Sequence, residues 1–194
     1  MKNYEYIIAS LPVIQQDDRS AANLDVDNLH EQILEQLDGG DREDFLLLLD
    51  GFRPDRLDGD FYRKALASRN GFMREYFLYD LNVRNTKVEY LNHALARPEG
   101  QDMLLLDEDD ENVFEGKEQV QAVLEQNDIL SRERGLDDLM WAKCEELTTM
   151  HVFDLDVILA FAARLQIIDR WLRLDPETGR ELFRKLVNEI RNNR

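Results

Sequence analysis

The stretch FDLDVILAFAARLQIIDRWLRLDPETGRELFRKLV, Phe153–Val187, decides the fold because it predicts two consecutive capped helices. Asp154 can cap the first helix, and Val157–Ala163 within that helix is apolar on every side, so we expect it to be buried. Asp175 followed by Pro176 is a strong start signal for the second helix. The stretch has no recognisable catalytic motif and therefore predicts helices that pack and contact partners.

The rest of the chain also predicts helices. Tyr4–Leu11 fits a short strand or a first helix equally well, because its apolar pattern suits both. Asp41 is a plausible cap for a helix that begins at Arg42. We predict an all-α, multi-helix bundle, whose helices, including the two above, cover residues 27–37, 42–50, 61–69, 72–96, 119–126, 128–150, 155–174 and 176–190.

A break in this pattern lies near the middle of the chain. Arg97-Pro98-Glu99-Gly100 stops the preceding helix, and Gln101–Gly116 is acidic and flanked by turn residues. The sequence therefore allows two small related helical lobes. These would be an N-terminal lobe at 1–100 and a C-terminal lobe at 117–194, with an acidic linker or loop at 101–116 between them.

Charge is high and unevenly spread. The formal net charge of -17 argues against a nucleic-acid partner, since phosphate binding begins with a basic surface. Gln101–Asp128 holds ten acids against Lys117 alone, a net of -9, whereas Arg164–Arg194 holds eight basic and five acidic residues, a net of +3. The two regions should therefore prefer different partners.

Cysteine usage and hydropathy indicate a cytoplasmic protein. Cys144 is the single cysteine, so no internal disulfide can form and a reducing compartment is expected. Val157–Ala163, the longest apolar run of the C-terminal half, is too short to cross a bilayer. Glu5 and Pro12 interrupt the N-terminal apolar stretch, and no cleavage site follows it, so a signal peptide is not expected.

No catalytic constellation is found. The sequence lacks a Gly-rich phosphate loop and a Gly-x-Ser-x-Gly elbow, and Glu145 and Glu146 beside Cys144 disfavour its thiolate. His30, His93 and His151 are scattered and do not form the Glu-x-x-His pairs of a di-metal bundle. We therefore predict no catalytic residue, no cofactor and no metal.

One acidic segment comes close to a calcium loop. In LDEDDENVFEGKE, Leu106–Glu118, the loop positions one, three, five and twelve are Asp107, Asp109, Glu111 and Glu118. Asn112 occupies position six, where the turn needs glycine, and the glutamate at position five is long. We therefore favour a solvated acidic loop.

Arg84 interrupts an apolar stripe on the predicted helix 72–96. The stripe residues recur at four- and three-residue steps and are Phe77, Leu81, Val88, Leu91 and Leu95. Two interpretations are open: Arg84 forms an internal ion pair or extends to solvent, or Asn82, Arg84 and Asn85 form a polar gap that another protein of an assembly fills.

A second candidate surface lies on the last predicted helix. Arg180, Arg184 and Arg191 lie beside an apolar stripe made of Leu182, Phe183, Leu186 and Ile190. This arrangement fits a solvated face or a face that docks on an acidic partner. Trp141 and Trp171 are most simply core residues.

Three long blocks, Gly71–Leu95, Ile129–Phe153 and Phe153–Val187, carry a family resemblance. With these blocks, the chain resembles a bacterial family of unassigned function whose genes lie among those for V-type (A-type) ATP synthase proteins, where the gene for the C-type subunit would be expected. EYFLYDLNVRN, Glu75–Asn85, is also similar to the Tyr-Asp-x-x-Asn helix of the C-type subunit. The C-type subunits are usually much longer and carry three related helical lobes.

The resemblance implies a non-catalytic helical spacer that couples the central axle to the membrane rotor ring. Its partners would be other ATP synthase subunits, and it would lie on the inner face of the cell membrane without spanning it. Two alternatives stay open, namely a carboxylate-based metal-dependent hydrolase and a cytoplasmic helical scaffold unrelated to the ATP synthase.

Overall fold

The computed structural model describes residues 4–16, 24–106 and 114–173. Within these ranges the chain forms α-helices and one 3-10 helix and has no strand, which confirms the predicted all-α fold. The elements are α1 (Tyr4–Ser10), α2 (Val26–Gln36), α3 (Gly39–Asp50), η2 (Pro54–Arg56), α4 (Gly59–Leu66), α5 (Gly71–Ala94), α6 (Lys117–Leu124), α7 (Ile129–Thr148) and α8 (Leu155–Arg173).

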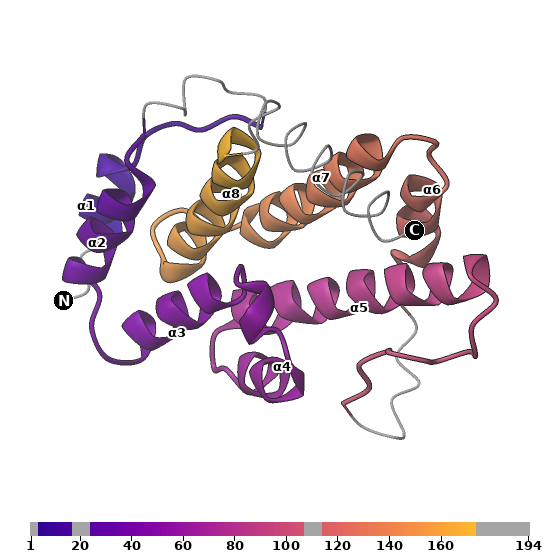
Figure 1. Ribbon diagram of the computed structural model, residues 1–194. Coiled ribbons are helices and arrows are strands. Elements are labelled where there is room, and N and C mark those ends of the chain that lie inside the picture. The colour runs from indigo at the N-terminus through magenta and orange to yellow at the C-terminus, as the bar shows by residue number, and fades with distance from the viewer. Residues whose placement is uncertain (1–3, 17–23, 107–113, 174–194) are drawn as a thin grey trace, which may run out of the picture.

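Helix α8 is the centre of the bundle (Figure 1). It packs against α1, α2, α3, α5 and α7. Every residue from Ile158 to Ala163 is buried, as predicted, and Val157 is half-buried. Neighbours surround α8 because its apolar residues cover more than one face, and one flanking helix could not bury them all. Asp154 caps the helix as predicted, since its Oδ1 accepts the backbone N–H of Val157 at 3.3 Å.

Helix α5 is the longest of the described helices and packs against α4 on one side and α7 and α8 on the other, with α6 near its end (Figure 1). The side chain of Asn70 caps it by accepting the backbone N–H of Met73 at 2.9 Å. Its first half is buried in an aromatic cluster, in which the rings of Phe61 and Phe77 meet edge to face with centroids 5.0 Å apart. Gly51, at the end of α3, lies directly against the ring of Phe77. A side chain at Gly51 would therefore collide with the core.

One hydrophobic core includes residues from both predicted lobes. Helices α5 and α8 join them, since α5 packs on α6 and α7 while α8 packs on α1, α2 and α3. The division of the chain at 101–116 stays a prediction. Within the described ranges, no helix combines the length and the apolarity that a membrane span requires.

The structure decides two local predictions near the N-terminus. Tyr4–Ser10 is a helix, which settles the choice left open between strand and helix. The prediction that Asp41 caps the next helix is wrong, because α3 begins at Gly39, three residues before the predicted start at Arg42, with Asp38 at the capping position. Asp41 lies in the first turn, where its carboxylate favours the positive end of the helix dipole.

The predicted apolar stripe is correct only for the first half of α5. Phe77 and Leu81 are buried, whereas Leu91 and Leu95 are 43% and 57% exposed. In the second half the buried side chains are Val83, Thr86 and Asn92. The buried face changes because α6 and residues 101–106 cover this part of the helix. Backbone groups of residues 101–106 need hydrogen-bond partners, so polar side chains of α5 are buried there.

Candidate partner-binding groove

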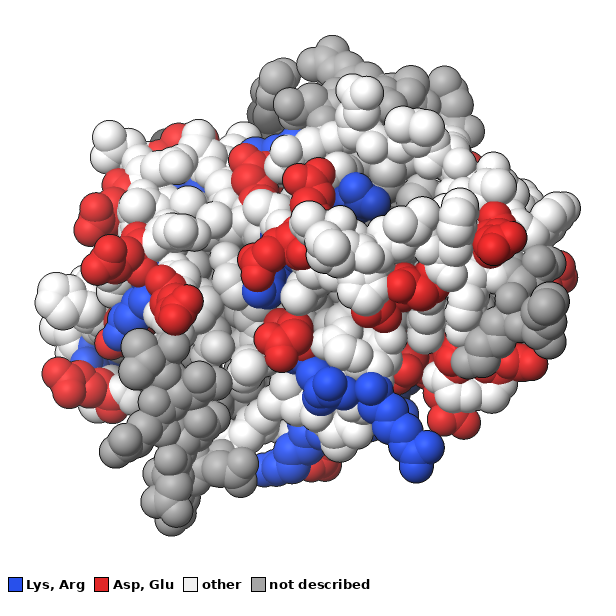
Figure 2. Space-filling view, turned by 180° about the vertical axis from the view of Figure 1, so that it is seen from behind, with Lys and Arg blue, Asp and Glu red and all other residues white. Residues whose placement is uncertain are grey.

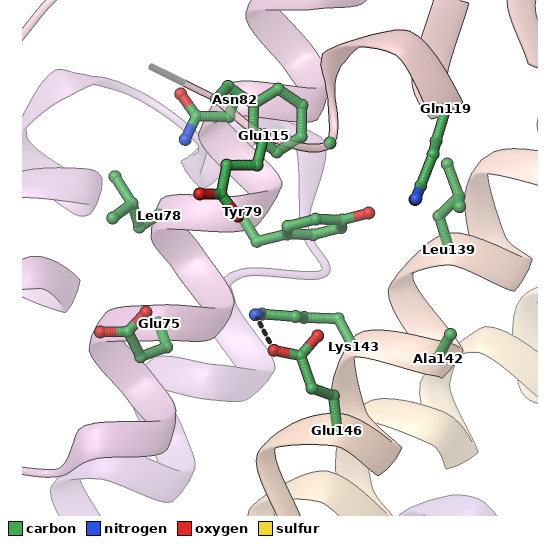
Figure 3. Close-up of a pocket in the computed structure, with 12 residues that line it drawn as sticks. Glu75, Leu78, Tyr79, Asn82, Glu115, Gln119, Leu139, Ala142, Lys143 and Glu146 are labelled. Carbon is green, nitrogen blue, oxygen red and sulfur yellow. Dashed lines mark hydrogen bonds and ion pairs between the residues drawn. The ribbon is translucent and has the colours of Figure 1, made fainter. Parts of the chain in front are cut away.

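A groove runs between α5 and α7 and is closed at one end by residues 114–119 (Figure 3). Its volume is about 480 Å³. The wall from α5 carries Glu75, Leu78, Tyr79 and Asn82, and the opposite wall from α7 carries Leu139, Ala142, Lys143 and Glu146. These side chains are four or three residues apart on each helix, so each set lies on one face.

Lys143 is the only cation that lines the groove, as far as the structure describes it. Its Nζ lies 2.8 Å from Oε1 of Glu146 and 5.5 Å from the centroid of the Tyr79 ring. The ring of Tyr79 also meets Phe114 edge to face, with centroids 5.4 Å apart. Burial, together with the negative charge of Glu146, raises the pKa of Tyr79, so its hydroxyl stays protonated. The centre of the groove is thus a fixed aromatic and charged cluster.

Two amides line the groove beside this cluster. Among the described residues, the side chains of Asn82 and Gln119 have no hydrogen-bond partner. Glu75 and Glu115 add two exposed carboxylates to the lining. The groove therefore offers hydrogen-bonding amides, an aromatic surface and excess negative charge, which suits a basic or hydrogen-bonding side chain of a partner.

Arg84, which the helical angle places within the apolar stripe of α5, is not buried there. Its side chain is exposed, and its Nη1 donates to the backbone carbonyl of Leu57 at 3.3 Å. It lies near Asp80, whose carboxylate accepts the hydroxyl of Tyr62 at 2.5 Å. Burial raises the pKa of Asp80, whereas the Tyr62 hydrogen bond and the Arg84 charge oppose that rise. The contacts of Arg84 therefore favour the first interpretation, in which its side chain is used within the molecule or extends to solvent.

The side chain of Asn85 is occupied within the molecule. Its Nδ2 donates to the carbonyl of Leu104 at 2.9 Å, and its Oδ1 accepts the N–H of Leu104 at 2.9 Å. Two helical turns further along α5, Asn92 Nδ2 donates to the carbonyl of Gln101 at 2.6 Å. The two asparagines attach residues 101–106 to α5, so of the three predicted gap residues only Asn82 faces the groove with a free amide among the described residues.

A buried polar contact at the end of α8 was not predicted. Asp137 of α7 is 8% exposed, and its Oδ2 accepts the indole N–H of Trp171 at 2.6 Å as well as a guanidinium N–H of Arg170. Burial raises the pKa of Asp137, and the Arg170 charge opposes that rise. No sequence signal pairs residues so far apart in the chain. Trp141 is buried as predicted, but Trp171 is only half-buried.

Several predicted residues lie outside the described ranges. These are Arg180, Arg184 and Arg191 of the last predicted helix and Asp107, Asp109 and Glu111 of the calcium-like segment. Glu118 is described and is exposed on α6. Within the described part of the chain, His, Cys, Asp and Glu side chains form no group of three or more that could hold a metal ion.

The histidines and Cys144 have ordinary environments. His30 is buried, and burial lowers its pKa, whereas exposed His151 bonds to Asp154, which raises its pKa. Cys144 is fully buried, and burial raises its pKa to about 12. A thiol of this kind is a poor nucleophile, as the neighbouring glutamates predicted.

Comparison with known proteins places the chain in a family. A family model described as "Protein of unknown function (DUF2764)" matches residues 51–194. A search of curated proteins and a search of solved structures each give no match. The matched region begins at the end of α3 and contains every residue of the groove. The chain therefore belongs to the DUF2764 family of proteins of unknown function.

Proposed function

We propose that this protein is a non-catalytic helical spacer of a V-type ATP synthase, which couples the central axle to the membrane rotor ring. The likeness of Glu75–Asn85 to the helix of the C-type subunit supports the ATP synthase as the assembly. This block forms the middle of α5, where it supplies both core side chains and one wall of the groove. The observation that carries the spacer role is a pair of exposed apolar patches at opposite ends of α5.

The first patch is the turn between α7 and α8, which we name the turn patch. It consists of Met150, Val152 and Phe153, which are 89%, 63% and 55% exposed. It lies beside the start of α5, because the capping Asn70 donates its Nδ2 to Oδ1 of Asp156 at 2.5 Å. Apolar side chains exposed together on a turn are typical of a contact surface.

The second patch, which we name the α5-end patch, consists of Leu91 and Leu95. These two residues are one turn apart on the outer side of the last part of α5. Helix α5 has 24 residues, so at about 1.5 Å per residue it is roughly 36 Å long, and the two patches lie toward its opposite ends. A continuous helix between them would transmit force from one partner to the other with little bending.

The surface charge also suits protein partners. Figure 2 shows Asp and Glu side chains spread across one face, whereas a group of Lys and Arg side chains lies along its lower edge. Complementary charges on two partners would steer their association and would fix the orientation of the spacer between them. The acidic lining of the groove provides one such surface for a basic partner segment.

The test is a capture experiment with tagged full-length protein from native membranes, followed by identification of the bound proteins. The unmodified protein should capture axle and ring proteins of the ATP synthase. Phe153→Asp should weaken capture of one partner, and Leu91→Asp should weaken capture of the other, each by about tenfold or more, as expected for a central apolar contact. Leu105→Asp, at a 69% exposed position outside both patches, is the matched control.

Three outcomes would contradict the proposal. If the tagged protein captures no ATP synthase protein above the untagged background, it does not belong to that assembly. If both variants lose both partners equally, the two patches do not bind different partners, which contradicts the spacer role. A stoichiometric divalent ion in the purified protein would instead support the metal-dependent hydrolase alternative.

A further inference from the structure

Residues 4–16 lie across the bundle as one segment, which we name the N-terminal arm. Its helical part, α1, packs against α8. The residues after α1 run past α8 to α7, where Gln16 makes two hydrogen bonds (Figure 1). The Nε2 of Gln16 donates to Oδ1 of Asp138 at 2.5 Å, and the carbonyl of Gln16 accepts Nη2 of Arg134 at 2.8 Å. Polar contacts therefore attach the end of the arm to α7.

The inner face of the arm has the spacing of a helix that binds in a groove. Ile7 is 1% exposed, and the half-buried Tyr4, Ile8 and Leu11 pack against the same core. These four residues stand at positions i, i+3, i+4 and i+7, which are the anchor positions of an amphipathic helix that docks on a partner. Tyr6, on the outer face, is 62% exposed. The arm is thus bound to its own chain in the way that a peptide ligand is bound to a protein.

The helix of the arm depends on this docking. Helix α1 has 7 residues, whereas isolated helices need about 12–15 residues to be even marginally stable in water. The arm is therefore helical because it is packed on α8, and the helix and its apolar contacts are lost together when the arm leaves. Segments of this kind open locally at a lower free energy than the whole protein.

The docking face and its cover belong to different parts of the chain. The family match begins at residue 51, so α8 lies inside the matched region and the arm lies outside it. Every residue from Ile158 to Ala163 of α8 is buried, and α1 is one of the helices that cover α8. Departure of the arm would uncover apolar surface of α8, which would again need a helix of similar chemistry to cover it.

We infer that the face of α8 under α1 is a docking site for an amphipathic helix, which the N-terminal arm occupies in this structure and which a helix of a partner protein occupies when the arm leaves. The partner helix carries apolar residues at the same four positions, i, i+3, i+4 and i+7. A tethered arm competes at an effective concentration on the order of millimolar, so it controls access to the site. The site is separate from the turn patch and the α5-end patch, so the inference goes beyond the spacer function.

Peptide binding to the purified full-length protein tests the inference. The probe is a fluorescent peptide with the sequence of the arm, YEYIIASLPVIQQ, Tyr4–Gln16, and its affinity is measured by fluorescence anisotropy. Ile7→Asp in the protein should raise the affinity for the peptide about tenfold or more, because the carboxylate cannot be buried and the protein's own arm leaves the site. Tyr6→Asp is the matched control: it places the same charge on the exposed side of α1 and should leave the affinity at the wild-type value.

A milder variant keeps the test decisive if Ile7→Asp disturbs the fold. Gln16→Ala removes the bond to Asp138 and should raise the affinity for the peptide about threefold. In the peptide itself, Ile7→Asp should lower the affinity for the Ile7→Asp protein about tenfold, whereas Tyr6→Lys should not change it.

Equal affinity of the unmodified peptide for the Ile7→Asp and Tyr6→Asp proteins would overturn the inference, and so would equal binding of the Ile7→Asp peptide and the unmodified peptide. A wild-type protein that is dimeric by light scattering, and monomeric with Ile7→Asp, would show that the arm docks on a second copy, which also contradicts the inference. No ATP synthase protein takes part in this experiment, so its failure is distinguishable from failure of the spacer function.

Discussion

Replacement of Gly51 by Ala should destabilise the protein, although the backbone there has a conformation that alanine adopts readily. The backbone of Gly51 has φ -63°, which any residue adopts, so the substitution causes no backbone strain. The added methyl group would instead overlap the Phe77 ring, which is 1% exposed and packed against Phe61 and Tyr76. The ring cannot move away without displacing other core rings.

Gly40→Ala is the matched control, because Gly40 lies in the first turn of the same helix and a methyl group there meets no atom within 4 Å. Both substitutions reduce the entropy of the unfolded chain and gain about 0.4–1 kcal/mol from it. Gly51→Ala also costs about 1–3 kcal/mol of overpacking. The free energies of unfolding of the two variants should therefore differ by about 1–3 kcal/mol, with Gly40→Ala above the wild type.

Urea unfolding followed by circular dichroism measures this difference, and thermal melting gives a second estimate, at about 2–4 °C per kcal/mol for a chain of this size. Combining Gly51→Ala with Phe77→Leu should cost less than the sum of the two separate changes, because the smaller side chain makes room for the methyl group. A Gly51→Ala variant that is as stable as Gly40→Ala would refute the close approach of α3 and α5.

Three further predictions concern polar contacts. Asn85→Ala should lower the free energy of unfolding by about 1–3 kcal/mol and speed amide exchange at 101–106, whereas Asn82→Ala, which removes no described bond, should change it by under about 0.5 kcal/mol. Arg84→Leu should lower the free energy of unfolding by about 1 kcal/mol at pH 8 and by less at pH 5. Burial already raises the pKa of Asp80, and loss of the Arg84 charge raises it further, so at pH 5 more of the Asp80 carboxyl is protonated and does not need the cation. A loss equal at both pH values would argue against that coupling. The wild type should be slightly more stable at pH 6 than at pH 8, and His151→Gln should abolish this difference. The hydrogen bond to Asp154 raises the folded pKa of His151. The stabilisation by protonated His151 is therefore complete below pH 6.5 and disappears as the pH rises through the folded pKa. Melting temperatures of both proteins at the two pH values decide this, and an unchanged pH dependence would count against it.

The features that follow from local sequence were predictable. The capping role of Asp154 depends on residues three positions apart, and the burial of Ile158–Ala163 follows from a run with no polar side. The helical class follows from the same kind of periodicity. The cap of α3 was misplaced by a few residues, since several acids near its start fit the same signal.

The features that depend on distant residues required the tertiary structure. The stripe on α5 has one regular pattern, yet Leu81 is buried and Leu95 is exposed, because the packing partners differ along the helix. The bonds from Asn85 to Leu104 and from Trp171 to Asp137, and the approach of Lys143 to Tyr79, join residues 19 to 64 positions apart. Sequence periodicity determines which face of a helix is apolar, but only the packed chain determines what covers that face, because burial and hydrogen bonding depend on neighbours in space.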